Sequence, residues 1–286
     1  MNDAPIVVGV DGSAPARAAL RWAAGEAVST GVPLLLVSSA NAGGIGASSP
    51  FVDELRFTAR RNLASAAETV EREHPELSVR TEQSSLVAAQ ALLGYSGRAR
   101  MLVLGRRGLG EFTGGLVGSV TSAVVAHAHC PVAVIPGPDE SGRGADGPVV
   151  VGVDGSPASL HALDVAFEAA DRYKAPLVAV HAWSDRDLVD VVAGTPGATW
   201  EDVDQQESVV LAESLAGRTQ DYPNVDVERV VVRDRPVRNL LERAENARLL
   251  VVGSRGRGGF EGMLLGSTSR ALLHTTPCPL LVVRRD

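Results

Sequence analysis

Two glycine-rich segments with identical spacing are candidate ligand-binding loops. The first runs from Gly105 to Ser119 and the second from Gly253 to Ser267, and both follow the pattern G-x2-G-x9-G-S. Each comes after a short apolar run that is typical of a buried parallel strand. Glycine lets the backbone turn tightly and approach a ligand where a Cβ would collide. We therefore expect a phosphorylated ligand at both loops.

A helix is expected to begin directly after each loop. In the first copy Gly118 opens the helical pattern, and Ser119, Thr121 or Ser122 is expected to cap it. The first turn of a helix has N–H groups without intrahelical partners and a partial positive charge, so it suits a phosphate. Lys174 is the only lysine, so neither loop has the lysine of a Walker-type P-loop.

An aspartate follows the first expected strand of each half of the chain. Asp11 comes after the run Ile6–Val10, and Asp154 follows the matching run of the second half. Open parallel sheets bind ligands beyond the carboxyl ends of their strands, where neighbouring connections run to opposite faces. If the first and fourth strands are neighbours, each aspartate meets a glycine loop over one crevice. The carboxylate would then accept hydrogen bonds from sugar hydroxyls while the loop holds phosphates. The sequence predicts a nucleotide site, made twice.

The elements that position these motifs alternate between strands and helices. In the first half we expect strands at residues 6–10, 34–38, 77–81, 101–104 and 132–135, with four helices between them. The second half repeats the plan, with a long helix at Trp200–Tyr222 and a third strand at Val225–Val232. The offset between halves is 143 residues at the aspartates and 148 at the loops, so about five residues are inserted between. We predict two tandem doubly wound α/β domains, each a five-stranded parallel sheet flanked by helices, at 1–137 and 148–286 with a linker at 138–147.

Composition and charge favour a soluble globular protein that does not bind nucleic acid. The chain has 286 residues, 45% of them hydrophobic and 21% charged, and a net charge of −7. Nucleic-acid binding needs a basic footprint. No apolar run approaches the roughly 18 residues of a membrane span, and the N-terminus lacks the pattern of a secretion signal. We expect a cytoplasmic protein whose two cysteines, Cys130 and Cys278, are small buried side chains.

The histidines are interpreted as structural or surface residues. His127 and His129 form a His-x-His string, but residues two apart on a helix face different sides, so a metal site is not expected. The isolated residues His161, His181 and His274 receive the same interpretation.

Charged residues within the loops leave two alternatives open for each group. Arg106, Arg107, Arg255 and Arg257 either pair with phosphates or remain solvated. Glu111 and Glu261 lie in the same loops, where a water-mediated contact with Mg²⁺ is the less favoured interpretation.

Taken together, these motifs resemble the universal stress protein family in its tandem, ATP-binding form. The resemblance covers nearly the whole chain apart from the linker, and it implies a Rossmann-like fold of the adenine nucleotide alpha hydrolase type. It also implies one ATP per domain, accompanied by Mg²⁺. The implied binding residues of the first domain are Asp11, Ser39, Leu104, Gly105, Gly108, Gly118, Ser119 and Val120. Those of the second domain are Asp154, Ala182, Val252, Gly253, Gly256, Gly266, Ser267 and Thr268.

The resemblance also assigns roles within each site. It places the two aspartates on the ribose, Ser119 and Ser267 on the phosphates, and the backbone at Ser39 and Ala182 beside the adenine. The chain departs from the family in the turn after the third strand, where neither repeat closely matches the family's G-x-P-A pattern.

The sequence favours a nucleotide-binding stress-response protein over an enzyme. It lacks the His-x-Gly-His string of nucleotidyl transferases and the Ser-Gly-Gly-x-Asp-Ser loop of ATP pyrophosphatases, and no candidate base repeats in both halves. No catalytic residue or protein-held metal is assigned. A slow ATPase or phosphotransferase, and an interaction scaffold with one degenerate site, remain alternatives. We expect the two domains to form an intramolecular pseudo-dimer. Homodimerisation of the whole chain is left open, and no protein partner is identified.

Overall fold

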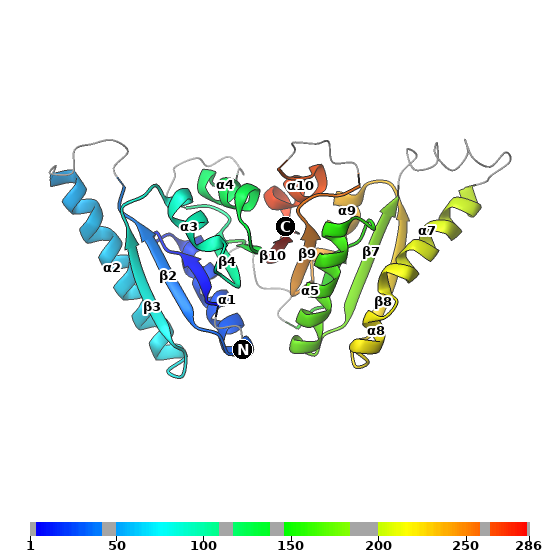
Figure 1. Ribbon diagram of the computed structural model, residues 1–286, viewed down its shortest axis with the longest axis horizontal. Coiled ribbons are helices and arrows are strands. Elements are labelled where there is room, and N and C mark those ends of the chain that lie inside the picture. The colour runs from blue at the N-terminus through cyan, green and yellow to red at the C-terminus, as the bar shows by residue number, and fades with distance from the viewer. Residues whose placement is uncertain are drawn as a thin grey trace. The chain divides into compact units, whose positions relative to one another are not determined.

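The computed structural model describes residues 4–41, 50–108, 117–137, 146–183, 200–257 and 264–284. The chain divides into two compact units, residues 1–141 and 142–286. Each unit consists of a parallel sheet and the helices that connect its strands (Figure 1). The expected α/β class is therefore confirmed.

The first unit alternates five strands with four helices within its described residues. In chain order the elements are β1 (Ile6–Gly9), α1 (Ala14–Thr30), β2 (Leu34–Ser39), α2 (Pro50–Glu73), β3 (Val79–Ser84), α3 (Ala88–Ser96), β4 (Met101–Gly105), α4 (Ser119–His127) and β5 (Val132–Ile135). The strands lie in the order β3-β2-β1-β4-β5, and each neighbouring pair is parallel.

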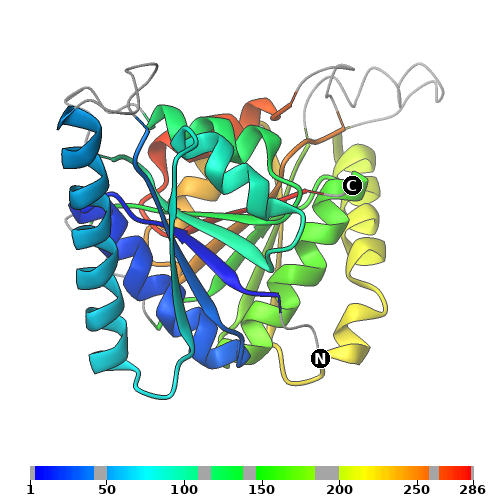
Figure 2. The same cartoon turned by 60° about the vertical axis from the view of Figure 1, so that its left-hand side comes forward.

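This strand order creates the switch point that the sequence analysis required. β1 lies between β2 and β4, with Gly9 opposite Val37 and Val8 opposite Val103. The chain leaves β1 toward β2 but later returns from β3 to β4, so right-handed crossovers place α1 and α2 on one face of the sheet and α3 and α4 on the other. Contacts agree with this, because α1 packs on α2 and α3 packs on α4. Figure 2 shows α2 running alongside β3.

Local sequence explains where the elements next to the switch point begin and end. Ile6, Val7 and Val8 have no exposed surface, as expected for a strand covered on both faces. The Ser13 hydroxyl accepts a hydrogen bond of 3.2 Å from the Ala16 N–H and so caps α1. The helix ends at Gly31, whose φ of 67° is the left-handed conformation that glycine adopts without strain.

The second unit repeats this plan with one additional short helix. Its elements are β6 (Val149–Gly152), α5 (Pro157–Tyr173), β7 (Leu177–Trp183), α7 (Trp200–Leu215), α8 (Arg218–Asp221), β8 (Val227–Arg233), α9 (Pro236–Ala244), β9 (Leu249–Gly253), α10 (Ser267–Thr275) and β10 (Leu280–Val283). The strand order is β10-β9-β6-β7-β8, again with parallel neighbours, so β6 lies beside β9 as β1 lies beside β4.

Two expected boundaries were wrong. The single helix expected over Trp200–Tyr222 breaks after Leu215, because Gly217 takes a φ of 83° that right-handed helix does not allow. The third strand of the first unit covers Val79–Ser84, two residues later than expected, and it begins where Val79 pairs with Leu34 of β2.

The strand registers also show where the extra residues of the second unit lie. Gly9 pairs with Val37 and Gly152 with Val180, an offset of 143 residues between the second strands. Leu34 pairs with Val79 and Leu177 with Val227, so the third strands are already offset by 148. The inserted residues therefore fall between the second strand and the following long helix, where residues 184–199 lie outside the described part of the chain.

Candidate functional site

A cavity of about 600 Å³ opens at the carboxyl ends of the strands in the first unit. It lies at the switch point between β1 and β4 and is walled by residues from both faces of the sheet. All eight residues that the sequence analysis proposed for the first domain line it: Asp11, Ser39, Leu104, Gly105, Gly108, Gly118, Ser119 and Val120. Residues as far apart in the chain as Asp11 and Val120 thus surround one space.

Asp11 lies in a tight turn directly after β1. Its Oδ1 atom accepts a hydrogen bond of 2.9 Å from the Ser13 N–H, and Gly12 between them has a φ of 85°. From helix α2, the Asn62 side chain donates a hydrogen bond of 3.0 Å to the backbone carbonyl of Asp11. A Cβ at Gly12 would come within 2.8 Å of the Asn62 amide. The turn is therefore held from two sides, which fixes the position of the carboxylate at the cavity.

The glycines of the first loop allow it to close against the turn. A Cβ at Gly108 would be 2.5 Å from Oδ2 of Asp11, and a Cβ at Gly105 would be 2.7 Å from the backbone of Pro15. Side-chain contacts under 3.0 Å are not tolerated, so both positions require glycine for reasons of space. The loop backbone and the carboxylate consequently form adjacent walls of the cavity.

Helix α4 begins at the cavity without a side-chain cap. The N-cap residue is Gly118, and no side chain caps the helix, which corrects the expectation that Ser119, Thr121 or Ser122 would do so. The Thr121 hydroxyl instead donates a hydrogen bond of 2.9 Å to the carbonyl of Gly105, so it ties the helix to the end of β4. The first N–H groups of the helix are left to face the cavity, where an anion would satisfy them.

The same backbone arrangement recurs in the second unit. Oδ1 of Asp154 accepts a hydrogen bond of 3.0 Å from the Ser156 N–H, and Oδ2 accepts one of 2.9 Å from the Arg257 N–H. A Cβ at Gly256 would collide with the Asp154 carboxylate, and a Cβ at Gly253 would meet the backbone of Ala158 at 2.8 Å. The aspartate turn and the glycine loop therefore meet here as they do in the first unit.

Hydrogen bonding lowers the pKa of Asp154. Burial acts to raise the pKa of this carboxyl group, but hydrogen bonds from Ser156, Ser159 and Arg257 together outweigh it. Asp154 is therefore a carboxylate at neutral pH, and it can accept hydrogen bonds from hydroxyl groups.

The remaining predicted residues of the second domain lie at the ends of its strands and at the start of α10. Ala182 is near the end of β7, Val252 and Gly253 end β9, and the helix starts at Ser267 and Thr268 after the N-cap Gly266. The Ser269 hydroxyl donates a hydrogen bond of 2.8 Å to the Gly253 carbonyl, which matches Thr121 in the first unit.

A sequence model described as the universal stress protein family matches residues 4–136 and 147–284. The chain belongs to the universal stress protein family. It is 42% identical to universal stress protein Rv2005c of Mycobacterium tuberculosis over 298 residues, which cover 98% of this chain and 97% of that protein.

Solved structures of universal stress proteins share this fold. A universal stress protein of Archaeoglobus fulgidus aligns with a TM-score of 0.72 at 21% identity over 100% of both chains. A shorter universal stress protein of the same organism, solved in complex with dAMP, is 28% identical and covers 46% of this chain and 97% of its own, with a TM-score of 0.37. The first comparison establishes the fold, and the second carries no conclusion about a ligand of this chain.

Several cavity residues of this universal stress protein were missed by the sequence analysis. They are Ser38, Thr58, Ala59, Asn62, Arg107 and Thr121. Thr121 could have been found, because a hydroxyl residue stands three places after the last glycine of both loops, as Thr121 and Ser269. Asn62 had no such signal, because Val210 occupies the matching position of the second repeat.

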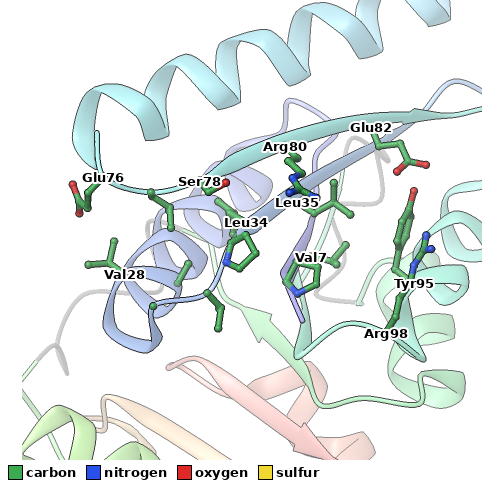
Figure 3. Close-up of a pocket in the computed structure, with 16 residues that line it drawn as sticks. Val7, Val28, Leu34, Leu35, Glu76, Ser78, Arg80, Glu82, Tyr95 and Arg98 are labelled. Atoms are coloured by element: carbon green, nitrogen blue, oxygen red, sulfur yellow. The ribbon is translucent and has the colours of Figure 1, made fainter. Parts of the chain in front are cut away.

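A second cavity of about 670 Å³ lies near the amino ends of the strands in the first unit (Figure 3). Its walls include Val7, Leu34 and Leu35, and at one end the Tyr95 hydroxyl points toward the Glu82 carboxylate. Burial and hydrogen bonding with Glu82 raise the pKa of Tyr95 to about 12. Although this cavity is slightly larger, parallel sheets bind ligands at the opposite, carboxyl edge, so the cavity at Asp11 is the candidate site.

Searches for other site types were restricted to the described residues. Within these residues no group of three or more His, Cys, Asp or Glu side chains is placed to hold a metal ion. None of the helices in the same part of the chain is long and apolar enough to cross a membrane. Glu111 and Glu261, considered for Mg²⁺ contact, lie outside the described residues.

Proposed function

We propose that this universal stress protein binds ATP at the cavity of its first unit and acts as a nucleotide-dependent regulator in a stress response. The observation that carries the proposal is the meeting of Asp11, the Gly105–Gly108 loop and the uncapped start of α4 around one cavity. A volume near 600 Å³ is typical of pockets for ligands of nucleotide size.

Each part of a nucleotide has a matching wall. Val37, Leu92 and Leu104 provide apolar surface for a base, and the Asp11 carboxylate is placed to accept hydrogen bonds from ribose hydroxyls. Gly105, Gly108 and the first turn of α4 present backbone to the phosphates, and Arg107 adds a positive charge on the same rim. Adenine as the base rests on the adenine-nucleotide binding that the motif resemblance implies.

Mg²⁺ would be carried mainly by the nucleotide. Magnesium keeps several water ligands and binds phosphate oxygens together with one or two carboxylates. In the described part of the cavity wall Asp11 is the one carboxylate, and its Oδ1 already accepts the Ser13 N–H. We therefore assign Mg²⁺ to the phosphate chain and water, with no dedicated protein cage.

We propose binding and not turnover as the primary activity. Hydrolysis needs a base that positions water at the terminal phosphate. Asp11 and Arg107 are the titratable side chains of the described cavity wall, and Asp11 is assigned to the ribose. Occupancy would act by favouring one conformation of the protein over another, which requires different nucleotide affinities in the two conformations.

The second unit is assigned the same ligand class, since it repeats the contact of aspartate turn and glycine loop. Its Asp154 carboxylate and Gly256 lie as close as their counterparts in the first unit, and α10 also starts at a glycine without a side-chain cap. We therefore propose one ATP site per domain.

Nucleotide carried through purification tests this proposal. The freshly purified protein is denatured, and the released nucleotide is identified and counted by chromatography. Adenine nucleotide that is present in the wild type and reduced by one site per chain in Asp11→Ala supports the first site. Absence of adenine nucleotide, with no heat of binding when ATP and Mg²⁺ are added, would refute the proposal.

A further inference from the structure

The second unit has charged side chains where the first has an open cavity wall. Val37 and Val180 occupy matching places in their sheets, so His181 stands where the first unit has Ser38. The offset of 148 residues that holds from the long helix to the glycine loop places Glu207 at the position of Ala59. Ser38 and Ala59 both line the cavity of the first unit.

His181 and Glu207 form a buried pair that shares a proton. The Nδ1 atom of His181 lies 2.7 Å from the Val153 carbonyl oxygen, and Nε2 lies 2.6 Å from Oε2 of Glu207. The carbonyl only accepts, so Nδ1 carries a hydrogen, and a second hydrogen must lie between Nε2 and Oε2. The two residues are 1% and 5% exposed. Wherever the shared proton lies, the charges of the pair sum to zero.

Arg257 brings an uncompensated positive charge to this pair. Its Nη1 atom lies 3.7 Å from the same Oε2 of Glu207, and its side chain is 41% exposed. Its Nη2 atom lies 2.6 Å from the position of a Cβ at Gly155, so the guanidinium covers the aspartate turn. In the first unit the neutral Asn62 amide occupies this place beside Gly12.

The extra charge belongs to the second repeat alone. Arg257 is the residue after Gly256, and the residue after Gly108 is Leu109, which is uncharged and lies outside the described residues. Arg255 and Arg107 match each other, so the arginine before the glycine is common to both loops. The two sites therefore differ by one cation at the edge of the phosphate loop.

We propose that Arg257 makes the second site more selective than the first for nucleotides with several phosphate groups. This inference rests on the proposed nucleotide binding. Glu207 holds the guanidinium over the turn when the site is empty, and a phosphate chain replaces Glu207 as its partner when nucleotide binds. The exchange is favourable only for a ligand with enough negative charge, so ATP gains more from it than AMP.

The test compares ATP with AMP in two single-site forms of the full chain. Asp154→Ala leaves the first site, Asp11→Ala leaves the second, and each is titrated by calorimetry with either nucleotide in the presence of Mg²⁺. We expect the ratio of ATP affinity to AMP affinity to be about three- to tenfold larger in the second site. Arg257→Leu, which introduces the side-chain type of position 109, should bring the second-site ratio down to that of the first.

Two further variants separate charge from folding. Glu207→Gln keeps a hydrogen bond to His181 but no longer holds the guanidinium, so ATP should bind the second site about threefold more tightly. Arg238→Leu removes an exposed arginine that pairs with Glu242 on α9 and should change neither site. Thermal unfolding of each variant shows whether the second unit remains folded.

The possible outcomes distinguish this inference from the proposed function. Equal ratios in the two sites, or a second-site ratio that Arg257→Leu leaves unchanged, would overturn the role of Arg257 while nucleotide binding stands. A second unit that binds neither nucleotide while the first binds both would also overturn it. Failure of both units to bind would overturn the proposed function together with the inference.

Discussion

Gly108 and Asp11, which are 97 positions apart in the chain, are so close that a Cβ at Gly108 would lie 2.5 Å from Oδ2 of the aspartate. The contact joins the loop after β4 to the turn after β1, the two neighbouring strands of the switch point. No strained backbone angle is involved, because the φ of Gly108 is not in the left-handed region. The need for glycine at this position is therefore purely one of space.

Gly108→Ala should weaken ATP binding at the first site by at least about tenfold, because the added methyl group must displace the carboxylate or the loop. Calorimetric titration in the Asp154→Ala background measures this site alone. Gly94→Ala is the matched control, since a Cβ at Gly94 has no atom within 4 Å. Equal losses in both variants would contradict a specific role for the contact between the loop and Asp11.

Gly105→Ala is a less suitable probe of the same loop. Its Cβ would be 2.7 Å from the Pro15 backbone, which cannot move without disturbing the start of α1. We expect this variant to lower the free energy of unfolding by about 1–3 kcal/mol, as overpacking commonly does. Denaturant unfolding checks this, and stability equal to that of the wild type would show that the loop moves away freely.

Asn62→Ala should destabilise the aspartate turn. The amide of Asn62 donates to the Asp11 carbonyl at 3.0 Å, and its loss should cost about 1 kcal/mol of unfolding free energy. ATP affinity at the first site should fall as well, because the carboxylate is less well positioned. Thr69→Ala, on the same helix, is the control, since the Thr69 hydroxyl donates within the helix to Ser65. A stable Asn62→Ala protein with unchanged affinity would show that the turn holds its own position.

The raised pKa of Tyr95 predicts a loss of stability at high pH. Its folded pKa of about 12 is above the ordinary value of 10.0, so the folded state disfavours the phenolate. The stability that this group contributes is complete below pH 10 and is lost as the pH rises toward about 12. Absorbance at 295 nm should show Tyr95 ionising near pH 12, and Tyr95→Phe should lose less stability over this interval. Ionisation of all three tyrosines near pH 10 would contradict the prediction.

The lowered pKa of Asp154 predicts the opposite dependence at low pH. A carboxylate that is hydrogen-bonded in the folded state stabilises it above the unfolded pKa, and this contribution is lost as the pH falls through the folded value. Unfolding free energies measured from pH 6 downward should therefore decrease less in Asp154→Asn than in the wild type. Parallel curves for the two proteins would show that the hydrogen bonds to Asp154 do not favour its charged form.

The fold and the first site could be predicted because their signals are local and repeated. The pattern G-x2-G-x9-G-S and the strand-aspartate pair each occur twice, and the order of strands follows from right-handed crossovers. β1 and β4 are neighbours as expected, and this places Asp11 beside Gly105.

The network of the second unit could not be read from one repeat. His181 was interpreted as a structural residue, and its pairing with Glu207 depends on the register of β7 and on which side of α7 faces the sheet. These are long-range properties that periodicity does not report. Comparison of the repeats offered a signal, since Ser38 becomes His181 and Ala59 becomes Glu207 at positions that face the sheet interior.

A crystal structure of the chain with ATP and Mg²⁺ tests the central claim most directly. The account predicts nucleotide density in the first unit, with the ribose at Asp11 and the phosphates between Gly105 and the start of α4. Density in the cavity beside Tyr95 instead, or an empty Asp11 cavity in crystals grown with saturating ATP, would contradict it.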